Sequence, residues 1–189
     1  NRIFIVIDKP IKIKNEDHLP ALKTTQCEVV FKDVGFQYET TKEKAVSKIN
    51  LKISGGKVTA LVGQSGAGKS TLINLIPRFY DPQEGKIEID NQNIKKINLN
   101  SLRKSISLVS QDVILFDDTV RNNIAYANSQ ASQRDIEKAC KYAAADIFIE
   151  KLPNKYETIV GENGVKLSGG QKQRISIARA ILKESPIIL

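Results

Sequence analysis

The most informative segment of this chain for its architecture is Gly63-Gln64-Ser65-Gly66-Ala67-Gly68-Lys69-Ser70-Thr71. Its G-x4-G-K-S spacing is that of a Walker A loop. The glycines let backbone N–H groups turn inward around an anion, and a following helix would direct its positive end at the same place. Lys69 adds a point charge for β- and γ-phosphates, and the Ser70 hydroxyl is a hard oxygen ligand for Mg²⁺. The segment therefore predicts a nucleoside triphosphate site in a P-loop α/β fold.

The residues on either side of this loop fit the motif. Residues 58–62 are a continuous apolar run, which predicts a parallel strand buried on both faces. Residues 69–76 predict a helix that ends at Pro77. Further strands are expected over residues 27–31, 49–53, 85–90 and 106–110. A glycine-rich turn with no ligand is the alternative, and the strand–loop–helix context argues against it.

The second half of the chain is helical in pattern and contains two capping boxes. Ser132 and Asp135 are spaced to open a helix through Ala145. The second box lies inside Leu167-Ser168-Gly169-Gly170-Gln171 and opens a helix to about Lys183. Gly169 and Gly170 would expose backbone N–H groups at the positive end of that helix, which makes a second anion site. A simple helix cap is the other interpretation.

Composition restricts the class of protein. The formal charge of +8 comes from scattered lysines without a basic run, so we expect no nucleic acid partner. No apolar run is long enough to span a bilayer. Cys27 and Cys140 lack metal-site spacing and are expected to be reduced thiols, and His18 to be a solvated linker residue. Methionine is absent, including at position 1, which indicates a segment of a longer chain.

The Walker A loop and the LSGGQ segment (residues 167–171) together closely resemble the nucleotide-binding domain of ABC transporters, from about Cys27 onward. In that family two such domains enclose ATP head to tail. The resemblance implies that Ser168, Gly169, Gly170 and Gln171 contact ATP held by the loop of a second ABC ATPase domain. It also implies that Tyr38 stacks on adenine, although an exposed edge aromatic is the alternative. Gln111 resembles the Q-loop glutamine, which contacts Mg²⁺ or the attacking water.

Two further matches point to exporters within that family. Residues 158–164 resemble the TxVGExG segment of exporters, and Arg2-Ile3-Phe4 followed by Asp8-Lys9-Pro10 resembles the linker after an exporter's last membrane helix. They imply an ATPase motor fused to its own transmembrane domain, on the cytoplasmic face of a bacterial membrane, that exports a lipid or a hydrophobic drug-like compound. A soluble ABC-type ATPase and a nonhydrolytic nucleotide-binding module are the alternatives.

The resemblance also implies a division of the chain. Residues 1–25 would be the linker, residues 26–110 and 186–189 a RecA-like core with a mixed sheet, and residues 111–185 an inserted helical subdomain. Lys69 and Gln111 are the expected catalytic residues, and Ser70 and Gln111 the Mg²⁺ ligands. The family's Walker B carboxylates would follow Leu189, so the fold is expected to be incomplete at this end. We expect negligible ATPase activity from the 189 residues alone.

Overall fold

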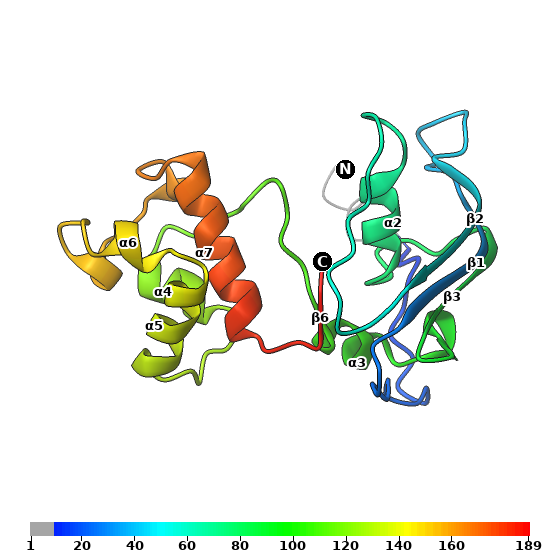
Figure 1. Ribbon diagram of the computed structural model, residues 1–189, viewed down its shortest axis with the longest axis horizontal. Helices are drawn as coiled ribbons and strands as arrows, with labels where there is room; N and C mark the ends of the chain where they lie inside the picture. Colours follow the sequence, from blue (N-terminus) through cyan, green and yellow to red (C-terminus); the bar gives the residue numbers. More distant parts are fainter. Residues whose placement is uncertain (1–9) are drawn as a thin grey trace. The chain divides into compact units, whose positions relative to one another are not determined.

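The computed structural model describes residues 10–189, and the linker motif at residues 2–9 lies outside them. The chain forms two compact units that divide between Ser105 and Ile106. Each unit has its own set of elements in Figure 1.

The first unit is built on an antiparallel sheet with strand order β2-β1-β3-β4. Strand β1 alternates at its start, where Val29 and Phe31 are buried while Val30 between them is partly exposed. Val29 pairs with Ile53 of one neighbour and with Ile89 of the other. The strands are β1 (Val29–Phe36), β2 (Val46–Ile53), β3 (Glu84–Ile89) and β4 (Gln92–Asn93).

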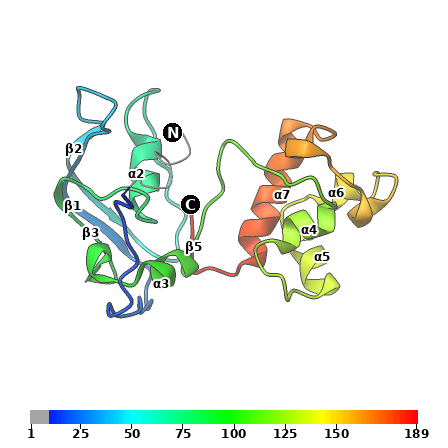
Figure 2. The same cartoon turned by 180° about the vertical axis from the view of Figure 1, so that it is seen from behind.

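Short helices complete this unit. In both views of the ribbon, α2 lies beside the sheet (Figures 1 and 2). It buries Leu72 and Leu75, and the sheet contributes buried Ile87 and Ile89 to the core. The burial of these side chains supplies most of the driving force for folding. The helices are α2 (Lys69–Leu75), α3 (Leu99–Lys104) and the 3₁₀ turn η1 (Ile94–Lys96).

An ion-pair cluster joins two strands of the sheet. The Glu88 carboxylate of β3, only 7% exposed, lies 2.6 Å from the Lys32 ammonium of β1 and 2.7 Å from that of Lys86. The hydrogen bonds from Lys32 and then from Lys86 hold the pKa of Glu88 below its ordinary value. Glu88 is therefore an ionised carboxylate with two cationic partners.

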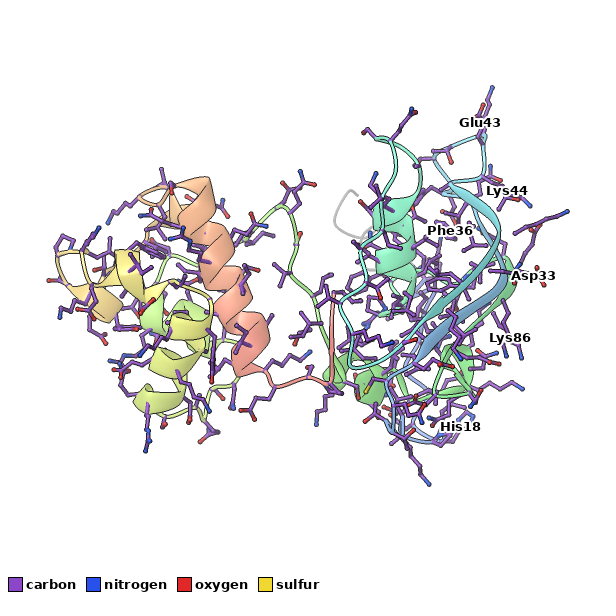
Figure 3. The ribbon with its side chains drawn as sticks, in the orientation of Figure 1. His18, Asp33, Phe36, Glu43, Lys44 and Lys86 are labelled. Atoms are coloured by element: carbon purple, nitrogen blue, oxygen red, sulfur yellow. The ribbon has the colours of Figure 1, made fainter. Side chains whose placement is uncertain are left out.

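An irregular arm, residues 10–28, is attached to the first unit by hydrogen bonds. The Leu22 amide donates to Ser101 Oγ over 2.9 Å, and the side-chain amide of Gln92 bonds both main-chain groups of Lys23. Leu22 itself is buried. His18 lies at the edge of this unit with its side chain 77% exposed, as predicted (Figure 3). The arm, which contains a turn at residues 17–18, is docked on the first unit.

Asp90 makes the densest of these attachments. Its Oδ2 accepts from three successive amides, at 2.6 Å from Thr25 and 3.1 Å from the next two, and its Oδ1 accepts from Glu28 at 3.0 Å. Burial alone would raise the pKa of Asp90, but these backbone donors outweigh it and lower the pKa. The carboxylate therefore holds the arm where it enters β1.

The second unit is mainly helical. Its core includes buried Ile124, Ile136, Cys140, Ile149 and Ile175. The helices are α4 (Val120–Ala125), α5 (Gln133–Tyr142), α6 (Asp146–Ile149) and α7 (Gly169–Leu182), with 3₁₀ turns η2 (Lys155–Glu157) and η3 (Glu162–Gly164). A short parallel pair, β5 (Ile106–Ser107) and β6 (Ile187–Ile188), belongs to the same unit.

Most predicted elements are present with shifted ends. Both capping boxes form, at Ser132 and at Ser168. The helix expected to reach residue 145 ends at Tyr142, because Ala144 adopts a left-handed conformation (φ 50°) before α6 begins. The strand expected over residues 106–110 is only two residues long.

The prediction of a buried strand over residues 58–62 is wrong. These residues form no strand, and Val58 and Val62 are 102% and 93% exposed. A parallel strand buried on both faces needs hydrogen-bonded neighbours on its edges and cover on its faces. The described sheet of the first unit is antiparallel, and the parallel strands β5 and β6 pair with each other. The assignment of residues 106–110 and 186–189 to the core therefore remains a prediction.

Candidate nucleotide-binding site

The Walker A loop adopts a conformation that only glycine suits at two positions. Gly66 and Gly68 have φ of 83° and 82°, in the left-handed region. A Cβ on Gly68 would also approach the Ala45 carbonyl oxygen and the Val46 Cγ1 to 2.6 Å each. The loop is therefore folded tightly at the entrance to α2, and its shape explains the glycines at positions 66 and 68.

Lys69 closes over the loop that precedes it. Its ammonium donates to the carbonyls of Gly63 and Gln64, both over 2.7 Å. The helix α2 begins at Lys69 behind Gly68, which provides no side-chain cap, so the first-turn N–H groups keep their capacity for an anion. Ser70 is exposed at the same helix start, whereas Thr71 is buried. A cation and uncapped amide donors thus converge on one place.

Tyr38 stands beside this helix. Its hydroxyl lies 3.1 Å from Thr71 Oγ1, and its ring packs edge-on with Phe36 and Tyr80, at centroid distances of 4.8 and 5.2 Å. It is half-buried rather than freely exposed. Phe36, labelled in Figure 3, comes from the end of β1.

A cavity of about 520 Å³ adjoins this aromatic group. Tyr38, Tyr80 and Arg103 are among the residues that line it. The Arg103 guanidinium donates to the carbonyls of Pro77 and Arg78 at 3.2 and 3.0 Å. Sequence reasoning missed Tyr80 and Arg103. The sequence signal at Tyr80 is an aromatic pair directly after Arg78, but that pattern alone names no ligand.

The LSGGQ segment forms the reciprocal cap of α7. Ser168 Oγ accepts from the Gln171 amide over 3.4 Å, and Gln171 Oε1 accepts from the Ser168 amide over 2.8 Å. Gly169 and Gly170 are exposed, and a Cβ on either would meet no heavy atom within 4 Å. Neither has a positive φ. Nothing in the fold of this unit therefore requires glycine at these two positions.

Gln111 is exposed in an irregular segment that leads to α4. It lies in the second unit with the LSGGQ segment, whereas Tyr38 and the Walker A loop lie in the first. The predicted site residues thus form two groups, one in each unit. In the first group the Tyr38 hydroxyl lies 3.1 Å from Oγ1 of Thr71 in the Walker A loop.

A glycine loop with its lysine folded over it, followed along the chain by an LSGGQ-capped helix, defines a nucleotide-binding domain of the P-loop NTPase class. The family model described as ABC transporter matches residues 46–189, and the chain belongs to this family. Its fold is the mixed α/β fold of an ABC exporter nucleotide-binding domain.

Individual relatives agree with this family. The chain is 49% identical over 188 residues to the "ATP-dependent lipid A-core flippase" of Desulfotalea psychrophila, covering 100% of this chain and 32% of that protein. It is 45% identical over 191 residues to "ABC transporter B family member 2" of Dictyostelium discoideum, covering 100% of this chain and 14% of that protein. The chain thus spans about a third of the flippase.

A solved structure is similar over nearly the whole chain. It is entitled "Structure of a bacterial Atm1-family ABC exporter with ATP bound", with a TM-score of 0.94 and 43% identity over 99% of this chain and 32% of that one. Within residues 10–189 we find no helix with the length and apolar character needed to cross a membrane.

Proposed function

We propose that the intact protein hydrolyses ATP and uses it to export a lipid or a hydrophobic drug-like compound across a bacterial membrane. The present chain is its motor on the cytoplasmic face, and a transmembrane domain in the same protein carries the substrate path. Support comes from the flippase relative, which aligns over the whole of this chain, and from the exporter-like residues 158–164.

The Walker A loop holds the phosphates in this proposal. Lys69 exchanges its two loop carbonyls for β- and γ-phosphate oxygens, while the residues from Gly63 to Thr71 supply backbone N–H donors. Tyr38 offers a ring already held in place by its neighbours, as an adenine platform needs.

We expect Mg²⁺ to reach this loop as a complex with ATP. Ser70 provides an exposed hydroxyl, and no group of three or more His, Cys, Asp or Glu side chains suited to a metal occurs in the described part of the chain. The protein would thus offer Ser70 and the amide oxygen of Gln111, with ATP phosphates as the remaining ligands. When bound, Mg²⁺ neutralises charge that develops on the phosphate oxygens.

The observation that carries the proposal is the unexplained glycine pair at the start of α7. Glycine near a helix start is less favourable than alanine unless something must approach the backbone closely. Since Gly169 and Gly170 have open space around them and ordinary φ, we attribute their identity to a ligand that approaches the backbone closely. We assign to Ser168, Gly169, Gly170 and Gln171 the γ-phosphate of ATP bound on a second ABC ATPase domain.

ATP turnover by the intact protein in membranes or detergent tests this proposal. We expect Gly170→Ala to lower turnover at least about a hundredfold, because its Cβ would keep the γ-phosphate away from the backbone N–H groups, with no loss of thermal stability. Lys69→Ala is the positive control, because it removes the phosphate cation. Full turnover by Gly170→Ala, or no turnover by the wild type, would contradict the proposal.

A further inference from the structure

One side chain of the second unit joins the residues after Gln111 to the helix that begins at the LSGGQ segment. Arg179 of α7 donates from Nη1 to the Ile114 carbonyl and from Nη2 to Asn123 Oδ1, both over 2.7 Å. Its Nε donates to the Asn123 carbonyl. The guanidinium carbon also lies 5.9 Å from the centre of the Phe116 ring. Arg179 thus contacts α4 and the segment before it simultaneously.

Asn123 completes the attachment from α4. It is 1% exposed, and its side-chain amide bonds both main-chain groups of Phe116, accepting over 2.9 Å and donating over 3.0 Å. A third bond runs from its Nδ2 to the Thr119 carbonyl over 2.9 Å. Between the two anchored residues, Leu115 is buried in the core of the unit. Residues 114–116 are therefore held rigidly although they have no regular secondary structure.

This arrangement needs arginine specifically. A guanidinium presents five N–H groups in one plane, so it can serve three acceptors and an aromatic face together, whereas a lysine ammonium is a compact point charge. In the described residues the hydrogen-bond partners of Arg179 are neutral oxygens rather than carboxylates. Burial lowers the pKa of Arg179, although the group stays charged. Arg179 is partly buried, and its nitrogens contact polar rather than apolar groups, so a simple packing role does not explain an arginine here.

We infer that Arg179 is a positioning residue for ATP hydrolysis, holding Gln111 at a set distance from the LSGGQ segment. Ser168 and Arg179 are separated by helix, about 16 Å at 1.5 Å per residue. From Ile114 back to Gln111 the chain can extend at most about 10 Å. The LSGGQ segment and the anchored residues 114–116 are thus both attached to α7. Gln111 lies three residues before this anchor, so a movement of α7 would also carry Gln111. This inference rests on the proposed function.

The first experiment measures kcat and ATP affinity of the intact protein carrying Arg179→Lys. We expect kcat to fall at least about tenfold while the Kd for ATP stays within about twofold, because the Walker A loop is untouched. Arg174→Lys is the matched control on the same helix, since Arg174 is exposed with one bond of 3.4 Å to the Ala144 carbonyl. It should leave both quantities within about twofold. An unchanged kcat per ATP-binding site in Arg179→Lys would overturn the inference.

A double-mutant cycle tests whether Arg179 acts through Gln111. In a Gln111→Ala background, Arg179→Lys should change the residual kcat by less than about twofold, because the group that it positions is gone. Losses that multiply would contradict this route and overturn the inference. Wild-type protein without ATP turnover would instead contradict the proposed function, so the two failures are distinguishable.

A second variant serves if Arg179→Lys does not fold. Asp112→Gly loosens the backbone between Gln111 and the anchored residues 114–116 while leaving every contact of Arg179 in place. Asp112 is exposed, and Asp112→Ala removes the same carboxylate without adding this freedom. We expect kcat of the glycine variant to be about two- to fivefold below that of the alanine variant. Equal rates would overturn the inference.

Discussion

Replacing Asp90 with alanine should release the arm from the first unit. The substitution removes a carboxylate that accepts four backbone N–H bonds from residues 25–28. A hydrogen bond to a charged group contributes about 1.5–3 kcal/mol. Three of the four bonds share one oxygen, and two of the donors belong to exposed residues that water can reach, so the bonds are not additive. We therefore expect local opening of the arm to become easier by about 2 kcal/mol.

Hydrogen exchange of the intact protein, resolved by peptide mass spectrometry, measures this opening locally. At 1.4 kcal/mol per factor of ten, the amides of residues 25–28 should exchange about 30-fold faster in Asp90→Ala. Amides of α7 in the second unit should be unchanged. Asp117→Ala, which removes an exposed carboxylate of the second unit, is the control and should leave the arm as protected as in the wild type. Acceleration of less than about threefold in Asp90→Ala would refute the reasoning.

Gly68→Ala should abolish ATP binding, because its Cβ would meet backbone and side-chain atoms at 2.6 Å. Gly66→Ala has open space for its Cβ and should be destabilised only by about 1–2 kcal/mol of left-handed strain. Equal losses of ATP affinity for the two variants in an equilibrium binding assay would contradict this. Gly170→Ala should keep or slightly raise the thermal midpoint of unfolding, since glycine costs about 1 kcal/mol relative to alanine in a helix. A clear fall in this midpoint would show that the fold itself needs the glycine. Because Lys32 and Lys86 lower the pKa of Glu88, its stabilisation is complete above the unfolded value of about 4.3 and is lost as pH falls through the folded value. Glu88→Gln should thus melt below the wild type at about pH 7, and the difference should close as pH falls below the folded pKa. A difference in melting temperature that does not depend on pH would exclude the mechanism.

Local signals in the sequence predicted the features that depend on a few adjacent residues. Both capping boxes formed because Ser132 and Ser168 need only a partner three residues later. The Walker A glycines were predicted for the same reason, since their left-handed conformations belong to one loop. The family resemblance was recognisable because both motifs are short and contiguous.

Features that depend on distant partners could not be predicted in this way. The apolar run at residues 58–62 indicated a buried strand, but burial requires neighbours that the run itself does not specify, and Val58 is fully exposed. Arg179 meets its acceptors across 56 and 65 residues of sequence. Asp90 reaches the arm across 62 to 65 residues. None of these pairings has a local sequence pattern.

Mixed pairs of two inactive variants would show whether ATP is bound between two copies of this chain. Lys69→Ala damages only the Walker A half of a site, and Gly170→Ala only the LSGGQ half. A mixed pair contains one Lys69→Ala copy and one Gly170→Ala copy. If the two halves of a site come from different copies, this pair has one site with both halves intact. Mixed pairs, co-expressed and purified through a different tag on each copy, should then regain ATP turnover that neither variant has alone. Mixed pairs as inactive as both parents would contradict a site shared between two copies.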